Sequence, residues 1–364
     1  MRKLRIGLYR GTALLPVFLF VLSLAGCGRE PLLTRESYVF GTRVEVLIWG
    51  EPEDKASHAA ASVLQEFDRL HRDYHAWQPS ALTALNDAIS AGRAHEVSPE
   101  LARLIHDAQT LSAAGDGLFD PGIGLLVKLW GFHDDTFKPQ LPDPAKLKTL
   151  IAAKPSIANL RLEGKCLPSF PETLGKCLVR SSNPAVALDF GGYLKGVALD
   201  RAATILRAQG IRNALINIGG NIIALGSKGE RPWRVGIQQP RGTGPMATLD
   251  LRDGEAIGTS GDYQRYFELN GRRYCHLIDP RSGEPAQGTE AVSILIPPGP
   301  QAGALSDAAT KPLFIAGPDW LAMARKTGID QAMRVDSQGH VQITAALKSR
   351  LKFEQPEIKV EVLP

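Results

Sequence analysis

A histidine stands just before a turn in the segment YCHLIDPRSG, where His276 is followed by Asp279, Pro280 and Gly283. An imidazole at the end of a strand-like run can be a packed or surface side chain. It can also exchange a proton with a substrate, since its ordinary pKa lies close to neutral pH. The choice between these roles depends on which other polar residues the fold brings beside His276.

Further segments contain carboxylates and glycines that a simple core element would not need. GLFDPGIGLL contains Asp120, LDFGGYLKG contains Asp189 and Lys195 six residues apart, TSGDYQRYF forms a polar turn between strands, and LSDAATKPLF contains Asp307. Taken singly, each has a structural interpretation. Asp120 suits an Asx-turn, Gly191 and Gly192 a tight strand-to-helix turn, and Asp307 a helix N-cap.

Several common kinds of site are excluded by their missing motifs. The chain has no GxGxxG, P-loop, HExxH, GxSxG or CxxC pattern, so it does not resemble a Rossmann NAD-binding protein, a zinc enzyme or a triad hydrolase. Its net charge is only +4, and no Lys/Arg run is interleaved with aromatic residues. Nucleic acid is therefore not an expected partner.

The N-terminus has the pattern of an export signal. A positive segment is followed by an apolar run over 12–25, shorter than the roughly 20 residues of a spanning helix. The run ends in Leu24-Ala25-Gly26-Cys27, which resembles a bacterial lipobox. We therefore expect a lipoprotein signal peptide over 1–26, a lipidated Cys27 and a linker over 27–37. The protein would be anchored to the outer or inner membrane of the cell envelope and face the periplasm, and Gly28 favours the outer membrane.

The remaining cysteines have two different expectations. Cys166 and Cys177 lie eleven residues apart and could pair in an oxidising compartment. Cys275 should alternate to the face opposite His276, which favours a small buried residue over a nucleophile.

Hydrophobic periodicity predicts an α+β fold. Helical spacing appears over 55–74, after Ser98-Pro99 up to Gly115, over about 191–208, and from Ala302. Alternating strand patterns occur over 38–49 and then in succession from residue 213 to residue 297. Residues 134–180 are richer in Pro and are interpreted as an insertion with one short helix after Pro144. Without a regular βαβ alternation, the sheets should be largely antiparallel.

Taken together, eight segments resemble the ApbE family, the FAD:protein FMN transferases. In order they are FGT, SALTALN, FDPGIGLLVKLWGF, DFGGYLKGVALD, NIGGN, TSGDYQRYF, HLIDPRSG and SDAATKPLF. They extend from Phe40 to Phe314. The resemblance implies a single ApbE-like (T-fold-like) catalytic domain, which we assign to 38–350, followed by a C-terminal tail over 351–364.

The resemblance also implies the reaction. FAD binds with Mg²⁺ on its pyrophosphate, AMP leaves, and FMN is transferred to a Thr or Ser hydroxyl of a target flavoprotein, such as a subunit of a sodium-pumping quinone reductase. FAD already carries a phosphoanhydride, so a periplasmic enzyme would need no ATP. Breaking the anhydride requires charge neutralisation, and Mg²⁺ with oxygen ligands is suited to that task.

The site residues follow from the same resemblance. Those implied to bind FAD are Phe40, Trp77, Leu118, Phe119, Asp120, Asp189, Lys195 and Ile278. Those implied to bind the metal are the backbone oxygen of Gly192, the carboxylate of Asp307, and Thr310. Asp307 and His276 are the catalytic candidates. His276 either accepts the proton of the incoming hydroxyl or holds its turn through Asp279.

Two positions depart from the family pattern. Lys311 stands where relatives usually have a metal-binding Thr, and Asn221 where Asp is commoner. In an active enzyme we expect the Lys311 ammonium to point away from the metal, towards the pyrophosphate or solvent. Two alternatives remain: an FAD pyrophosphatase that releases FMN and AMP, and a lipoprotein that binds FAD without turnover.

Overall fold

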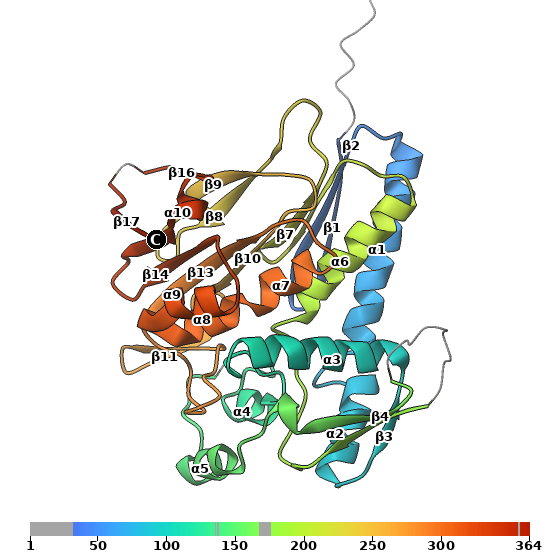
Figure 1. Ribbon diagram of the computed structural model, residues 1–364, viewed down its shortest axis with the longest axis vertical. Helices are drawn as coiled ribbons and strands as arrows, with labels where there is room; N and C mark the ends of the chain where they lie inside the picture. Colours follow the sequence, from blue (N-terminus) through green and yellow to red (C-terminus); the bar gives the residue numbers. More distant parts are fainter. Residues whose placement is uncertain (1–31, 135, 137, 167–175, 356) are drawn as a thin grey trace, which may run out of the picture. The chain divides into compact units, whose positions relative to one another are not determined.

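The fold is centred on a large sheet whose strands follow one another in chain order. The computed structural model describes residues 32–134, 136, 138–166, 176–355 and 357–364. Within this part of the chain, nine strands form one sheet (Figure 1), in the order β1 (Leu32–Val39), β2 (Thr42–Trp49), β6 (Ala214–Ile218), β7 (Asn221–Leu225), β10 (Ala256–Gly261), β13 (Thr289–Ile296), β14 (Ala332–Asp336), β15 (Val341–Thr344) and β17 (Val360–Leu363). Its neighbours pair antiparallel except β15 and β17. The predicted α+β class with largely antiparallel sheets is confirmed.

Each face of this sheet buries its own apolar core. One core packs the sheet against helices, which are seen in front of it in Figure 1. They are α1 (Glu53–Asp73), α6 (Leu194–Ala208), α7 (Ala302–Ala308), α8 (Thr310–Ala316) and α9 (Trp320–Lys326). The other core packs the sheet against a three-stranded sheet of β16 (Leu351–Phe353), β9 (Pro245–Leu251) and β8 (Trp233–Gln238). Strand alternation divides the residues of β6, since Leu215 enters the second core and Ile216 the first.

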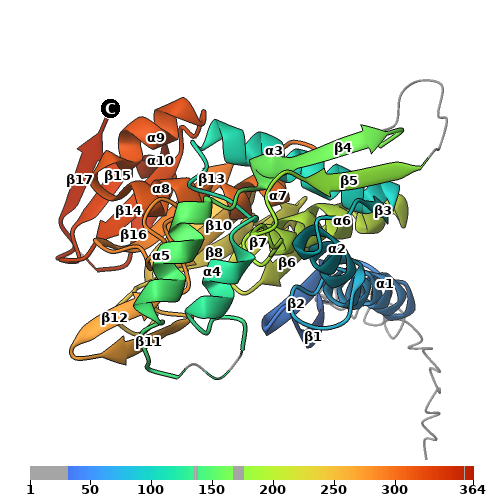
Figure 2. The same ribbon diagram turned by 90° about the horizontal axis from the view of Figure 1, so that it is seen from below.

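A second group of elements lies at the lower end of the view in Figure 1 and is seen from below in Figure 2. It contains α2 (Ala81–Ser90), α3 (Pro99–Ala114), α4 (Gly124–Leu129), α5 (Pro144–Ala153), and a small sheet of β3 (His95–Val97), β5 (Cys177–Ser181) and β4 (Leu160–Gly164). The remaining elements are the hairpin β11 (Tyr266–Leu269) and β12 (Arg272–Cys275), α10 (Ala345–Lys348), and the short 3₁₀ turns Ile157–Asn159 and Gly317–Asp319.

Local sequence explains where these elements begin and turn. Ser98 caps α3 by accepting the N–H of Leu101 at 3.1 Å, and Pro99 occupies the first turn. Gly219 and Gly220 both have positive φ, at 58° and 93°, and so form the tight turn between β6 and β7. Phe40 and Gly41 turn β1 into β2 with φ of 56° and 67°. A left-handed Phe is uncommon because its Cβ crowds the backbone.

Both predicted domain boundaries are wrong. The expected linker over 27–37 overlaps β1, which begins at Leu32 and pairs along its whole length with β2. The expected tail over 351–364 contributes β16 and β17 to two sheets. These are edge or short strands with few buried side chains, so they carry little of the alternation by which a strand is recognised in sequence. The signal peptide and Cys27 lie outside the described residues.

The proposed insertion over 134–180 contains the expected helix, α5, and also two strands that its pattern did not reveal. Cys166 and Cys177 form a disulfide, and β4 and β5 pair just before and after it. Cys275 is buried, and burial raises the pKa of its thiol to about 12, which confirms the expectation of a packed residue. A search of the described helices for a membrane-spanning segment found none of sufficient length and apolarity.

Gly196 allows α6 and α7 to touch, which gives a test of the packing. A Cβ there would lie 2.3 Å from the carbonyl oxygen of Gly303 and 2.8 Å from the Cβ of Asp307. We expect Gly196→Ala to lower the free energy of unfolding by about 1–3 kcal/mol, the usual cost of overpacking, measured by urea denaturation. Gly299→Ala is the control, because its Cβ would meet nothing nearer than 4.0 Å. Equal stability of the two variants would contradict this account.

Candidate active site

Asn86 holds the segment that leads into the site, a role that sequence reasoning missed. From α2 its side-chain nitrogen donates to the carbonyl of Leu188 at 2.9 Å, and its oxygen accepts the N–H of Leu188 at 2.7 Å. The next residue is Asp189, whose carboxylate accepts the N–H of Gly191 at 2.8 Å. The sequence feature that could have revealed this role is the capping pair Ser80 and Thr83, which fixes the start of α2 and so the direction of Asn86.

Asp307 is the buried centre of the site. It lies at the end of α7 with no exposed surface, and one carboxylate oxygen accepts the N–H of Gly196 at 3.1 Å. The other oxygen contacts the ammonium of Lys311. Burial alone would raise the pKa of Asp307, but Lys311, Lys195 and the Gly196 N–H outweigh it and hold the pKa below its usual value. Asp307 is therefore an ionised carboxylate.

Lys311 points towards Asp307, one of the expected metal ligands; the expectation that its ammonium avoids a bound metal stays a prediction. The ammonium donates to the carboxylate and also, at 2.7 Å, to the backbone carbonyl of Asp307. The physical reason is burial: the Lys311 side chain is 10% exposed, and a buried ammonium needs an anionic partner. The carboxylate of Asp307, four residues earlier in the chain, is that partner.

The three expected metal ligands come together, but not as an open metal site. Gly192 lies next to Lys311, since a Cβ on Gly192 would be 3.1 Å from the Lys311 Cε. The Thr310 hydroxyl donates to the Asp307 carbonyl at 2.7 Å and shares a 2.7 Å hydrogen bond with Ser260. The described residues contain no cluster of three or more His, Cys, Asp or Glu side chains that could hold a metal.

Charge repulsion makes this arrangement unsuitable for Mg²⁺. The ammonium of Lys311 already contacts the Asp307 oxygens that the ion would need. A unit charge and a divalent charge about 4 Å apart repel by about 8 kcal/mol at an effective dielectric of about 20. As arranged, the residues do not fit the expected ion.

His276 lies among cations and is neutral. Its Nδ1 is 3.2 Å from the carbonyl oxygen of Arg265. A carbonyl cannot donate, so Nδ1 carries the proton and Nε2 keeps its lone pair. Burial, followed by the charges of Arg265 and Lys195, lowers the pKa of His276 to about 3. The Asp279 carboxylate binds Arg281 and the N–H of Arg281, so the described contacts of His276 do not support a role in holding that turn.

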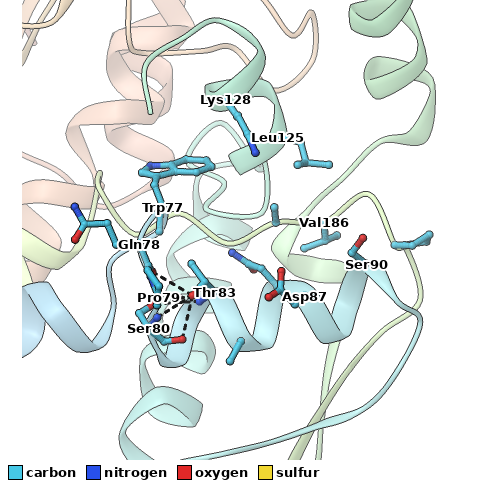
Figure 3. A pocket seen from close by; sticks show the side chains of 15 residues that line it. Trp77, Gln78, Pro79, Ser80, Thr83, Asp87, Ser90, Leu125, Lys128 and Val186 are labelled. Carbon is cyan, nitrogen blue, oxygen red and sulfur yellow. Dashed lines mark hydrogen bonds between the residues drawn. The ribbon is translucent and has the colours of Figure 1, made fainter. Parts of the chain in front are cut away.

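Trp77 lines a cleft of about 670 Å³ at the N-terminal end of α2. Figure 3 shows Trp77 and Lys128 across this cleft from Thr83 and Asp87. The ring of Trp77 is half-buried and meets His133 edge-on at 5.7 Å. His276, Lys195 and Asp307 do not line the cleft. The segment that Asn86 holds connects the cleft to Asp189, because Val186 and Ala187 line the cleft and Asp189 follows two residues later.

The other expected FAD-binding residues are mostly engaged within the protein. Asp120 forms the structural turn, since one oxygen accepts the N–H of Gly122 and of Ile157, each at 2.8 Å. Leu118 and Phe119 are buried in the first core, and Ile278 packs in a smaller cluster with Trp130 and Tyr274. The flavin contacts of these residues remain predictions.

Phe40 and Asn221 also have described partners. The ring of Phe40 packs on Phe67 and His71 of α1 at 6.1 and 5.6 Å. Asn221 is 2% exposed, and its side-chain oxygen accepts the N–H of Thr259 at 3.3 Å. A neutral amide thus occupies the position where relatives more often have a carboxylate.

Comparisons agree with this architecture. The chain superimposes on the crystal structure of the ApbE protein of Thermotoga maritima with a TM-score of 0.76, at 27% identity, over 89% of this chain and 100% of that one. It is 42% identical to an FAD:protein FMN transferase of Rhodobacter capsulatus over 88% of this chain, and spans 59% of that relative's length. It is 33% identical to the enzyme of the same name from Treponema pallidum, over 79% of this chain and 80% of the relative.

The fold is thus that of the ApbE structures. The ApbE family model matches residues 40–333. The chain belongs to the ApbE family.

The protonation state of His276 can be measured directly. Because burial and neighbouring cations favour the neutral ring, we expect its NMR signals not to titrate between about pH 5 and 8, with His276→Gln used for assignment. The unfolded chain would protonate near pH 6.5, so the free energy of unfolding should fall as pH drops below about 6.5. A titration midpoint close to 6.5 in the folded protein would contradict this assignment.

Proposed function

We propose that the protein is an FAD:protein FMN transferase that joins FMN to a Thr or Ser hydroxyl of a target flavoprotein through a phosphoester bond and releases AMP. One observation carries the proposal: Nδ1 of His276 is held by the carbonyl of Arg265, so Nε2 keeps its lone pair, and the charges of Arg265, Lys195 and Lys311 act on this ring. Membership of the ApbE family, whose relatives bear this name, supports the flavin substrate.

The chemistry follows from these charges. A pyrophosphate carries negative charge that grows on the leaving phosphate, and cations fixed before the reaction stabilise that charge. Nε2 of His276 accepts the proton of the attacking hydroxyl, since Nδ1 already bears one. A bound anion raises the pKa of the imidazole, which improves it as a base. The resemblance implies Mg²⁺ as well, but Lys311 holds the oxygens of Asp307, so the proposed chemistry uses protein side chains.

Recognition of the flavin nucleotide would use the cleft and the segment beside it. The flat face of Trp77 suits stacking on a ring of FAD. The exposed ammonium of Lys128 lies near Trp77, across the cleft from Asp87. Asp189, held by Asn86 through Leu188, is the candidate acceptor for a donor group of FAD.

We further propose that the enzyme is a lipoprotein anchored through Cys27 and facing the periplasm. The lipobox-like LAGC supports this location. The Cys166–Cys177 disulfide also supports it, since disulfides persist in oxidising compartments and are rare in the cytosol.

The transfer reaction separates this function from its two alternatives. We expect the purified protein with FAD to release AMP and to add the mass of one FMN to an acceptor subunit of a sodium-pumping quinone reductase, detected by mass spectrometry. Release of AMP and free FMN, with no labelled acceptor, would favour the pyrophosphatase. Bound FAD that stays intact would favour the binding lipoprotein. An acceptor with its Thr and Ser residues replaced is the control.

Asp189 should be needed for FAD affinity. Removing its carboxylate leaves a donor of FAD unpaired, which costs about 1–3 kcal/mol, so Asp189→Ala should raise the Kd about 10- to 100-fold by fluorescence titration. Asp189→Asn keeps an oxygen for the N–H of Gly191 and so tests charge apart from turn geometry. Asp250→Asn on β9, which alters an exposed ion pair with Arg234 of β8, is the matched control. Unchanged affinity in both Asp189 variants would exclude Asp189 from the site.

A further inference from the structure

Lys311 occupies a position that differs in kind from a surface lysine. Its ammonium is buried against α7, bonded to the carboxylate of Asp307 and, at 2.7 Å, to the carbonyl of the same residue. An ammonium has three N–H donors. The two hydrogen bonds to Asp307 use two of these donors and fix the charge in place, which leaves one donor for an oxygen of the substrate in the proposed reaction.

The oxygens of Asp307 and Thr310 that would have to bind a metal here already have protein partners. The Asp307 carboxylate is shared between Lys311 and the N–H of Gly196. The Asp307 carbonyl accepts both Lys311 and Thr310, and the Thr310 hydroxyl also bonds Ser260. A divalent cation would have to break several of these bonds and displace a like charge.

The residues around Lys311 are mostly cationic. Lys195, in the first turn of α6, directly precedes Gly196, whose N–H donates to Asp307, and the carbonyl of Arg265 holds the ring of His276. The one carboxylate at the centre, Asp307, is neutralised by Lys311. The group keeps a net positive charge from protein residues alone.

On the basis of the proposed function, we propose that Lys311 takes the place of a divalent cation on Asp307. The enzyme would then cleave the FAD pyrophosphate without a bound metal. The target hydroxyl oxygen forms a bond to the phosphorus on the FMN side of the anhydride. The bond from that phosphorus to the bridging oxygen breaks, and the bridging oxygen leaves on AMP. The hydroxyl proton passes to Nε2 of His276 and then to water. Lys311 donates to a phosphate oxygen as the negative charge on the leaving group grows.

The metal requirement of AMP release tests this role. With FAD and the quinone-reductase acceptor subunit, the wild-type rate should change less than about twofold between excess Mg²⁺ and EDTA. Lys311→Met should lose about 10²-fold or more in both conditions, the usual cost of removing one transition-state donor. Lys311→Thr restores a hydroxyl of the family type, so its activity should be lost in EDTA and recovered with Mg²⁺.

A readout without turnover supplements the rates. Calorimetric titration of the flavin-free protein with Mg²⁺ should show no binding by the wild type and measurable binding by Lys311→Thr. Lys311→Met leaves Asp307 buried and unpaired and can fail to fold. Combining it with Asp307→Asn removes both charges, and this double variant should fold, by its thermal melt, but remain inactive.

The outcomes separate the two proposals. Wild-type activity that disappears in EDTA and returns with Mg²⁺ would overturn the role of Lys311 and leave the transferase function standing. Full activity of the double variant would also overturn it. Absence of AMP release in both Mg²⁺ and EDTA would overturn the transferase function and, with it, this inference.

Discussion

The site depends on one buried carboxylate. Asp307 has no exposed surface, and a charge in that position is tolerated only with close partners of opposite charge and hydrogen-bond donors. The N–H of Gly196 supplies a partner from α6, and Lys311 supplies one from α8. Helices α6 and α8, which carry Lys195, Lys311 and Thr310, are thus tied to a single side chain on α7. Their approach requires Gly196, because any Cβ there would strike α7.

This arrangement keeps positive charge and a neutral base close together. An imidazole among cations would normally be expected to lose its usefulness as a base, because the cations oppose its protonation. In the proposed reaction the same cations would attract a doubly charged pyrophosphate, and the bound anion would oppose the effect that lowers the pKa of His276. The base would therefore gain strength only when substrate is bound. Hydrogen bonding of Nδ1 to the backbone fixes which nitrogen is involved.

Sequence reasoning succeeded where pattern and local structure agree. Helices α1, α3 and α6, which were expected from their helical spacing, bury one apolar face each. It failed for β1 and β17, since edge strands bury few side chains, and for β4 and β5, which form in a Pro-containing segment closed by a disulfide. Asp120 and Lys311 show a different limit. Each residue type is compatible with a binding role and with a structural role. The hydrogen bond of Asp120 with Ile157 and that of Lys311 with Asp307 are what distinguish the two roles, and sequence does not show them.

The strictly increasing strand order of the large sheet has a consequence for biogenesis. Each strand pairs with one already synthesised, so the sheet can grow from one side as the chain emerges, without inserting a late strand between earlier ones. At each stage the growing side of the sheet ends in an edge strand, which is a template for pairing with another chain, and in the described sheet β17 is the last of these. Truncations at the C-terminus should be less soluble than their small loss of core would suggest.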